Sequence, residues 1–543
     1  MTAQAAGLRA RVRVRPAPRR MPGWAYGAVT VVGILLVWQL AADTVLRPMG
    51  TIPSPTAILA RFGSDGAGFY LGNVGVTALE ALTGYLIGVG AALAVAVVVL
   101  MLPRLTGVAM QVAVISYCVP LVAIGPIVYL IIGAPDAGRP SGTAVVLAAM
   151  GVFFTTLVGA LLGLASVDRR SLEVVDAFGG TRWSRLFRVQ LISAVPAIIN
   201  ALKIAAPSAV LGAILGEYVG GVDKGLGPAL LSAQQNMDVE RTWALAITSA
   251  ALAGAWFALM SVLAAVVNRL GWRAHAAGMP ASPPAGRGAA VKSVLGGLAS
   301  VLVILLAWPL VLWALDVSPF VGKTPMQLWT YLVVDEKGTE RVVTLLGELG
   351  VTLQDAGLGF VAGLGIALLA AVLFQFVPPL QSGFMPIAIL LQSVPLIAMA
   401  PVIILVLGRG PATVAAMAGL IVFFPALVNI SAALREAPAA LTDLVSVYGA
   451  GRVRELLLVR LPACLPAVFA SIRIALPGAI AGALLAEWLA TGKGLGYAII
   501  SALGRGDNTQ VWACVVLVTG ASLVLYGLAA QAEKLVARVW GGA

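Results

Sequence analysis

Charged residues are scarce in this sequence of 543 residues. They make up 11% of it, whereas hydrophobic residues make up 60% and the mean hydropathy is +0.99. Soluble domains carry about 25% charged residues, so the composition excludes a soluble globular protein. Apolar stretches of about 20 residues recur along the chain, and each can cross a hydrocarbon core about 30 Å thick. Because the backbone finds no water there, the sequence predicts an all-α polytopic membrane protein.

Histidine and cysteine are scarce as well, which excludes several kinds of site. The single histidine, His275, lies in a polar linker, so we expect no metal site and no catalytic residues. The cysteines Cys118, Cys464 and Cys514 lie in or beside apolar runs, and we interpret them as packing residues rather than a disulfide framework. The net charge of +12 could suggest a nucleic-acid partner, but the basic residues are spread over the loops between apolar runs. We therefore expect no nucleic-acid partner.

A nucleotide-binding loop is also missing. The pattern G-x-x-x-x-G-K-[ST] does not occur, so we expect the chain itself to bind no nucleotide or other cofactor. The segment "GKGLG" at 492–496 lacks the spacing, and we interpret it as a turn. The apolar runs show no grouped His, Cys or carboxylates, which leaves little support for a membrane enzyme or an assembly scaffold.

The two halves of the chain repeat one another. "NVGVTALEALTGYLIGVGAALAVAV" (73–97) matches "ELGVTLQDAGLGFVAGLGIALLAAV" (348–372) at an offset of 275. "SYCVPLVAIGPIVYLIIG" (116–133) matches "LQSVPLIAMAPVIILVLG" (391–408) at the same offset. After a longer loop in the first half the offset becomes 270, which pairs Phe153-Phe154 with Phe423-Phe424, Pro196 with Pro466, Lys203 with Arg473, and Glu217 with Glu487. Shared hydrophobicity does not produce such pairs, so the sequence predicts an internal duplication.

We expect twelve transmembrane helices, as two tandem six-helix repeats with the same orientation. The expected spans are 24–46, 75–101, 108–132, 143–166, 195–219 and 242–268, then 294–315, 351–376, 382–407, 412–434, 465–489 and 511–533. The chain then divides into a basic tail at 1–23, a first repeat at 24–272, a flexible linker at 273–293 rich in Pro, Gly and Ala, and a second repeat at 294–543. We interpret 24–46 as the first span rather than as part of a cleaved signal peptide.

The loop charges predict how the chain is oriented. With the N-terminus in the cytoplasm, the cytoplasmic segments hold 22 of the 35 basic residues and the opposite side holds 11. Basic residues are enriched in cytoplasmic loops, so we expect both termini in the cytoplasm and the chain in the bacterial cytoplasmic membrane.

One polar segment interrupts the apolar runs in each half. "DAFGGTRWSRLFRVQLISAVP" covers 176–196 and "SVYGAGRVRELLLVRLPACLP" covers 446–466. Glycines permit a sharp turn into a short helix. The apolar residues of that helix fall at i, i+3 and i+4 on one face: Trp183, Leu186 and Phe187 in the first half, and Val453, Leu456 and Leu457 in the second. The pattern predicts an amphipathic helix parallel to the membrane whose apolar ridge a partner groove can accept.

A single segment of this kind could simply rest on the lipid headgroups. Here it occurs twice, after the fourth helix of each half, in loops at about 168–192 and 438–462. A pair of equivalent protruding helices favours a two-fold symmetric partner beneath them.

Both segments resemble the cytoplasmic "EAA" loop of ABC importer permeases. That loop has a glutamate six residues before a glycine, followed after nine residues by an aliphatic-x-Leu-Pro sequence. The matching residues are Glu173, Gly179, Val189, Leu191 and Ile192 in the first half, and Asp443, Gly449, Val459, Leu461 and Pro462 in the second. The chain departs from the pattern at Asp443 and Ile192, and the alanines after the acidic residue are absent.

A second resemblance narrows the family. "VPLVAIGPIVYLIIG", "VPLIAMAPVIILVLG", "LGEYVGGVDKGLG" and "LAEWLATGKGLG" look like the permeases of the nitrate/sulfonate/taurine class of importers. The resemblance covers about 60–270 and 335–540. Such permeases normally have six helices and pair with another copy, so this chain looks like the pair fused into one polypeptide.

The resemblance implies the mechanism and the partners. Each coupling loop would dock on one of two copies of a cytoplasmic ABC ATPase, which would bind the ATP-Mg. An extracytoplasmic binding protein would deliver a small solute, and this class selects its cargo largely through that protein. The loop residues to which the coupling role carries over are Glu173, Gly179, Trp183, Leu186, Phe187, Asp443, Gly449, Val453, Leu456, Leu457 and Pro462.

We expect the solute pathway between the two halves, near their pseudo-two-fold axis. Prolines break the third helix of each half, and the carbonyls that they release can face a cavity: Pro120, Pro126, Pro395 and Pro401. Glu217 and Glu487 recur near the outer ends of the fifth helices, and we consider them candidate gate residues. Plain packing kinks and interfacial placement are the simpler interpretations. The alternative function is a secondary transporter with six-plus-six parallel repeats, which would need ion-coupling charges in the bundle.

Overall fold

The computed structural model describes residues 23–102, 105–136, 139–165, 167, 169–269, 287–392 and 394–540. Within these ranges the regular elements are all helical, which confirms the predicted all-α class. The predicted basic tail and most of the predicted linker lie outside the described residues. The last helix before the linker ends at Arg269 and the next begins at Arg287, so residues 287–293 are helical rather than part of a linker.

Among its described residues the first half has eleven α-helices. They are α1 (Gly23–Asp43), α2 (Pro55–Asp65), α3 (Ala67–Met101), α4 (Thr106–Cys118), α5 (Leu121–Ile132), α6 (Gly142–Ala165), α7 (Arg169–Ala177), α8 (Arg182–Arg185), α9 (Leu191–Val219), α10 (Leu226–Gln235) and α11 (Val239–Arg269). A 3₁₀ turn covers Arg47–Met49, and a π-helical turn, Leu186–Gln190, joins α8 to α9.

The described part of the second half repeats this order, again with eleven α-helices. They are α12 (Arg287–Ala314), α13 (Pro325–Trp329), α14 (Gly338–Phe376), α15 (Pro378–Gln392), α16 (Leu396–Leu407), α17 (Pro411–Arg435), α18 (Ala439–Val447), α19 (Arg452–Glu455), α20 (Leu461–Ala486), α21 (Gly494–Gly504) and α22 (Asn508–Trp540). π-helical turns cover Thr330–Val334, Leu456–Arg460 and Glu487–Thr491.

The short helices α2 and α13 begin in the same way. The Ser54 hydroxyl accepts a hydrogen bond from the backbone N–H of Ala57, and a proline follows at the first helical position. In the second half Thr324 and Gln327 form a reciprocal capping box, again with a proline at the first position. A capping hydroxyl before a proline is a helix-start signal, because the proline ring presets the helical φ and its missing N–H is not needed there.

Eight described helices are long and apolar enough to cross a membrane, and a bent pair makes up to nine. The pair is α4 and α5, which meet at an angle of 94° within the span expected at 108–132, where the sequence predicted a helix broken by proline. The predicted first spans correspond to α1 and α12, whose described apolar stretches Val32–Asp43 and Val301–Ala314 are shorter. A membrane-spanning helical bundle is therefore established, whereas the number twelve remains a prediction.

The two halves interlock. α1 packs against α15 of the second half, and in the equivalent place α12 packs against α4 of the first half. α11 likewise packs against α16, and α22 against α5. The first helix of each half therefore packs against the other half, and the two contacts are related by a pseudo-two-fold axis.

Small residues bring the central helices into close contact. In the first half a Cβ on Gly212 of α9 would lie 2.5 Å from the carbonyl oxygen of Leu147 on α6. In the second half a Cβ on Gly482 of α20 would lie 2.6 Å from the Cα of Ala418 on α17. Glycine is required at both positions because helices pack in lipid mainly through close van der Waals contact.

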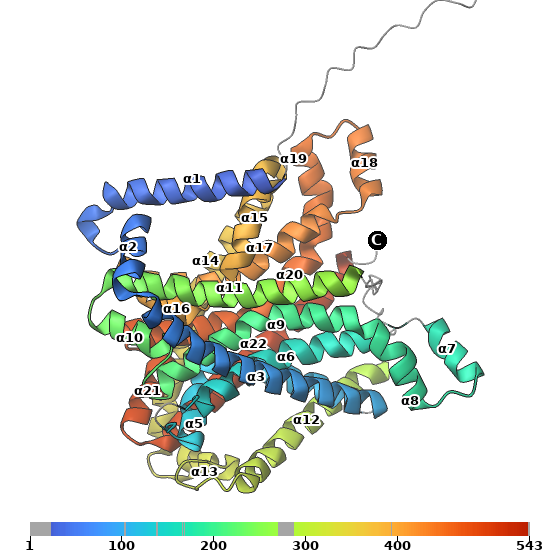
Figure 1. Cartoon of the computed structure of the whole chain (residues 1–543). Helices are drawn as coiled ribbons and strands as arrows, with labels where there is room; N and C mark the ends of the chain where they lie inside the picture. Colours follow the sequence, from blue (N-terminus) through green and yellow to red (C-terminus); the bar gives the residue numbers. More distant parts are fainter. Residues whose placement is uncertain are drawn as a thin grey trace, which may run out of the picture.

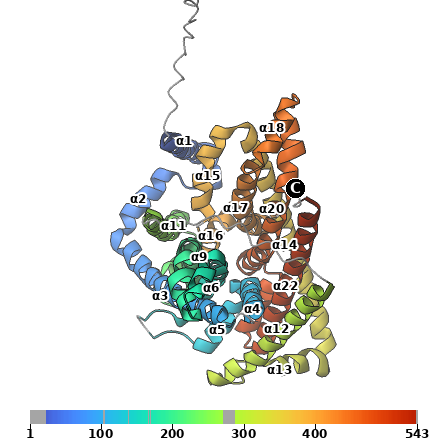
Figure 2. The same cartoon turned by 90° about the vertical axis from the view of Figure 1, so that its right-hand side faces the viewer.

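The views fix the two ends of the bundle. Figure 1 shows α7–α8 on the right, α18–α19 at the upper right, and the short helices α10 and α21 on the left. Figure 2 looks at that right-hand end and shows α1 and α11 nearly end-on, so α1 runs alongside the bundle. The two polar segments that were predicted to be equivalent therefore lie at the same end of the molecule.

Candidate functional site

The two polar loops have the same backbone course. In the first, α7 is followed by a reversal at Gly179, whose φ is +71°, and then by α8. In the second, α18 is followed by a reversal at Gly449, whose φ is +76°, and then by α19. A positive φ of this size favours glycine, which explains why these residues occupy the turns.

Each loop presents two apolar side chains to the surface. Trp183 and Phe187 are 56% and 59% exposed, and their rings stack with centroids 5.8 Å apart. Val453 and Leu457 are 57% and 56% exposed at the equivalent positions. Large apolar side chains held in the open on a short helix are candidates for a protein interface.

Only two of the three apolar residues predicted to form the ridge of each loop are exposed. Leu186 is fully buried and Leu456 is 4% exposed, so both anchor the loops to the bundle rather than face a partner. Glu173 and Asp443, the acidic residues that match the EAA loop, are exposed. Pro462, which matches the proline of that loop, lies in the first turn of α20.

Ion pairs hold the two loops in different ways. Arg185 pairs with Asp176 inside the first loop. In the second loop Arg460 pairs with Glu455 at 2.7 Å and also donates to the carbonyl oxygen of Leu434 on α17 at 3.0 Å. The second loop is thus tied to the bundle, whereas the pair in the first loop is internal to it.

Both loops continue without a break into the bundle. The stretch from Trp183 to Val219 forms one helical span of 37 residues, and the stretch from Arg452 to Thr491 forms one of 40 residues. A displacement of a loop therefore moves the fifth helix of the same half directly.

A cavity of about 300 Å³ lies between the two halves. The first half contributes residues from the junction of α4 with α5 and from the middle of α6 and α9: Ser116, Tyr117, Val119, Pro120, Leu121, Val122, Met150, Gly151, Phe154, Thr155, Ser208, Leu211 and Leu215. The second half contributes residues from α16, α17 and α20: Leu396, Ile397, Ile421, Pro477, Gly478, Ala481 and Leu485. The cavity thus lies where the pathway was expected, midway along helices that span the membrane.

The four predicted prolines take two kinds of position. Pro120 and Pro395 directly precede the first residues of α5 and α16, and Pro120, which lies at the bend between α4 and α5, lines the cavity. Pro126 and Pro401 lie inside these helices, are buried, and are not among the described lining residues. A role in the pathway therefore rests on Pro120 and on the turn after Pro395, whose next residue Leu396 lines the cavity.

Glu217 lies in a buried polar cluster of the first half, beside the start of α10. It is 2% exposed, and its two carboxylate oxygens accept hydrogen bonds from the hydroxyl of Thr77 at 2.5 Å and from the N–H of Gly227 at 2.6 Å. Thr77 in turn accepts from the N–H of Leu226 at 2.9 Å, and Asn73 accepts from the N–H of Gly225 at 3.1 Å. The repeated "KGLG" sequence is therefore a turn whose amides are captured by α3 and α9.

The second half has the same cluster around Glu487. This residue is fully buried and accepts hydrogen bonds from Thr352 at 3.0 Å and from the N–H of Gly496 at 2.8 Å. Thr352 accepts from the N–H of Leu495 at 2.9 Å, and Glu348 from the N–H of Gly494 at 2.8 Å. Both bonds reach the same oxygen of Glu487, Oε2, and its Oε1 has no partner among the described residues. The two hydrogen bonds offset part of the cost of burying this carboxyl group.

Neither glutamate is among the described residues that line the central cavity. Each lies within its own half, so the structure gives it a structural role, and the gate role stays a prediction. The supporting residues Asn73, Thr77, Glu348 and Thr352 were not singled out from the sequence, although the 275-residue offset already pairs Asn73 with Glu348 and Thr77 with Thr352.

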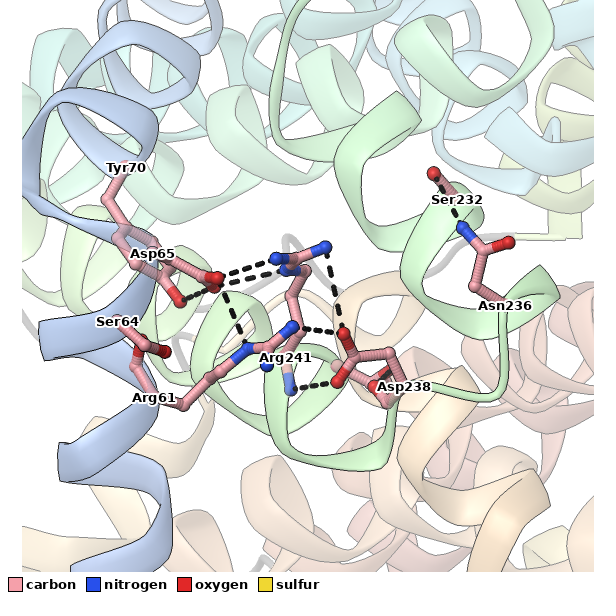
Figure 3. Close-up of polar contacts among 9 residues, drawn as sticks. Arg61, Ser64, Asp65, Tyr70, Ser232, Asn236, Asp238 and Arg241 are labelled. Carbon is pink, nitrogen blue, oxygen red and sulfur yellow. Dashed lines mark hydrogen bonds and ion pairs between the residues drawn. The ribbon is translucent and has the colours of Figure 1, made fainter.

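A second polar cluster joins α2 to the start of α11 (Figure 3). The Asp65 carboxylate forms an ion pair with Arg241 at 2.6 Å and accepts a hydrogen bond from the hydroxyl of Tyr70 at 2.8 Å. It also forms an ion pair with Arg61 at 3.2 Å. Arg61 and Arg241 also pair with Asp238. Bonding to Arg241 holds the pKa of the Asp65 carboxyl below its ordinary value.

The second half builds the equivalent contact differently. The hydroxyl of Tyr331 donates a hydrogen bond to Asp507 at 3.3 Å. When the two halves are aligned, Tyr331 corresponds to Arg61 and Asp507 corresponds to Asp238. Burial raises the pKa of Tyr331 to about 12, so this hydroxyl stays protonated at neutral pH. Arg341 covers the Tyr331 ring at 4.0 Å and pairs with Asp335 at 2.8 Å. Both halves thus fasten the segment with the short helix α2 or α13 to the start of the last helix of that half, α11 or α22.

These features define a class of protein: a duplicated helical membrane protein with a cavity between its halves and two equivalent loops exposed at one end. A family model described as "Binding-protein-dependent transport system inner membrane component" matches residues 84–271 and again residues 363–538. The chain belongs to this family, and it carries two copies of the family domain. It is therefore a transport subunit of the cytoplasmic membrane rather than an enzyme, and the predicted duplication is confirmed.

Relatives support the same assignment. The chain is 36% identical over 32% of its length to a "Probable ABC transporter permease protein" of Haemophilus influenzae, and the match covers 72% of that protein. It is 34% identical over 29% of its length to the riboflavin transport system permease of Chloroflexus aurantiacus, covering 59% of it. It is 23% identical over 36% of its length to a nitrate import permease of Leptolyngbya laminosa, covering 71% of it. No solved structure matches the chain.

Proposed function

We propose that this chain is a fused permease of an ABC importer, in which one polypeptide replaces the usual permease dimer. It receives a small solute from an extracytoplasmic binding protein and passes it inward, and two copies of a cytoplasmic ABC ATPase drive the cycle by hydrolysing ATP. The observation that carries this proposal is the pair of equivalent exposed loops at one end of the molecule, each in its own copy of the family domain.

The loops are the coupling elements. In each, two exposed apolar side chains form a small ridge that fits a cleft on the ATPase: Trp183 and Phe187 in the first loop, Val453 and Leu457 in the second. Burying such a ridge removes apolar surface from water and stabilises the contact. The reversals at Gly179 and Gly449 hold the ridges away from the bundle.

Movement of the loops reaches the pathway through the fifth helices. Ser208 on α9 and Pro477 on α20 both line the central cavity, and both lie in spans that begin in the loops. When the two ATPase subunits close on ATP-Mg, they draw the loops together and rock the two halves about the cavity. This chain contributes no nucleotide ligand to that step.

The orientation is part of the same proposal. The end that carries the loops faces the cytoplasm, together with both termini, and the end with α10 and α21 faces outward toward the binding protein. The excess of basic residues in the predicted cytoplasmic segments supports this orientation.

Substitution of the two turn glycines tests the proposal. Gly179→Val and Gly449→Val force a β-branched residue into a positive φ and so misplace both ridges. We expect the double variant to fold but to lose co-purification with a co-expressed ABC ATPase from the same genome. Gly254→Val, at a helical position with open space around it, is the matched control. A secondary transporter would instead keep transporting without any ATPase.

A further inference from the structure

We propose that the central cavity binds an uncharged organic solute with one or two rings, which lies between a hydroxyl-bearing wall from the first half and an apolar wall from the second. This inference rests on the proposed function, since it assigns the substrate class of the same pathway.

The described lining of the cavity offers no charged side chain to pair with an ion. None of the described residues that line it is Lys, Arg, His, Asp or Glu. Moving a charged group from water into such surroundings without a partner is strongly unfavourable. A bare inorganic anion is therefore a poor occupant, whereas an uncharged solute loses little on entering.

The polar groups are all on one side. The lining residues with hydroxyl groups are Ser116, Tyr117, Thr155 and Ser208, and all belong to the first half. The equivalent residues of the second half are Leu391, Gln392, Pro425 and Gly478, none of which has a hydroxyl. The duplication has thus diverged within the cavity, where only the first half keeps hydroxyl groups.

Three of these hydroxyls have no hydrogen-bond partner among the described residues: those of Ser116, Thr155 and Ser208. Tyr117 donates to the carbonyl oxygen of Ile474 across the two halves at 2.7 Å, which leaves its oxygen able to accept. Polar groups that are partly buried and unpartnered are available to a ligand, and their hydroxyls can both donate and accept.

The remaining surface suits a flat apolar body. The rings of Tyr117 and Phe154 stack with centroids 4.3 Å apart, and both residues line the cavity. Leu396, Ile421 and Leu485 face the cavity from the second half. Aromatic side chains favour offset or edge-on contact with another ring.

The size sets the upper limit. The cavity holds about 300 Å³. A cavity of about 150 Å³ accommodates benzene, so this one accommodates roughly one or two rings with a small polar substituent. The features that carry the inference are the uncharged lining, the one-sided hydroxyls and this volume.

Equilibrium dialysis of the purified full chain in nanodiscs tests the inference with three probes. Radiolabelled benzamide is an uncharged ring with one polar group, benzoate is the same ring with a negative charge, and nitrate is a bare anion. We expect saturable binding of benzamide above empty nanodiscs, and binding of benzoate and nitrate at least tenfold weaker.

Variants locate the site. Ala481→Phe fills the cavity and should abolish benzamide binding, and Thr155→Val removes one hydroxyl and should weaken it about three- to tenfold. Thr248→Val is the control, because it removes a hydroxyl on α11 that bonds to the carbonyl oxygen of Ala244, outside the lining. Each variant is first checked for an unchanged elution profile.

Three results would overturn the inference: no saturable benzamide binding, benzoate or nitrate binding as tightly as benzamide, or benzamide binding unchanged in both cavity variants. Assembly with the ATPase is measured on the same samples. If that assembly persists, the substrate class is wrong and the proposed function stands; if it is absent, the proposed function fails as well.

Discussion

Single glycines decide whether the turn that leads into α21 can form. Gly494 lies beside the buried carboxylate of Glu487 with a φ of +78°, and a Cβ added there would lie 2.3 Å from the carboxyl carbon. Gly492, two residues earlier, also has a positive φ, of +67°, but has nothing within 4 Å. The two positions therefore separate backbone strain from steric exclusion.

We predict that Gly494→Ala lowers the free energy of unfolding by about 3 kcal/mol or more, because strain and a clash with Glu487 add. Gly492→Ala should cost only about 1–2 kcal/mol, from the left-handed backbone alone. Thermal unfolding of the purified protein, followed by tryptophan fluorescence, measures the difference. Equal effects of the two substitutions would contradict the role given to the carboxylate.

The polar cluster of Asp65, Arg61, Arg241 and Asp238 in Figure 3 predicts that the stability of the protein depends on pH. Since the pKa of Asp65 is lowered in the folded protein, its contribution to stability is present above the ordinary value of 3.8 and is lost as the pH falls below it. Asp65→Asn should therefore lower the melting temperature at pH 6, and its difference from the wild type should vanish as the pH falls well below 3.8.

The exposed residue Asp316 supplies the control for that measurement. Asp316→Asn should leave the melting temperature unchanged across the same range of pH, because this side chain is at the surface and asparagine tolerates its φ of +51°. A constant difference between Asp65→Asn and the wild type at all pH values would show that packing, and not charge, explains the effect.

At the scale of elements, the two polar loops to which we assign the coupling role differ in what they expose. The first presents the stacked pair Trp183 and Phe187, whereas the second presents Val453 and Leu457. Binding energy at interfaces concentrates in large aromatic residues, above all tryptophan. The first loop should therefore contribute more to ATPase binding than the second.

We predict that Trp183→Ala weakens the affinity for the ATPase more than tenfold, and Val453→Ala less than about fivefold, since valine buries much less apolar area. Titration of the purified chain with a fluorescently labelled ATPase measures both. A larger loss for Val453→Ala would show that the second loop dominates.

The sequence predicted the elements well where periodicity and turn residues act locally. The apolar runs, the loop after the fourth helix and the breaks at Pro120 and Pro395 all follow from such signals. The burial of Leu186 did not, because the periodicity groups it with Trp183 and Phe187 but does not show which edge of that face the bundle covers.

Contacts between distant segments were beyond the reach of local patterns. The pairing of Asp65 with Arg241 joins residues far apart in sequence, and the sequence does not show which aspartate each arginine meets. The hydroxyl-lined side of the cavity likewise emerges only when Ser116, Thr155 and Ser208 are brought together by three helices. Glu217 and Glu487 were found by the repeat, but not their partners in the "KGLG" turns.

At the scale of the whole molecule, the exchange of first helices predicts that the halves hold together without the linker. α1 packs on α15 and α12 on α4, and Tyr117 donates a hydrogen bond to Ile474 across the interface. Co-expression of residues 1–279 with residues 280–543 should therefore yield a complex that co-purifies. Removal of residues 1–45 from the first fragment should reduce the yield of that complex, and separate elution of the intact fragments would contradict the interlocked arrangement.

The central claim is that one fused permease chain binds two ATPase subunits. Native mass spectrometry of the importer, purified with its co-expressed ATPase, tests this claim most directly. One copy of this 55.6 kDa chain with two ATPase chains is the predicted composition. Two copies of this chain with two ATPases, or one copy with a single ATPase, would contradict it.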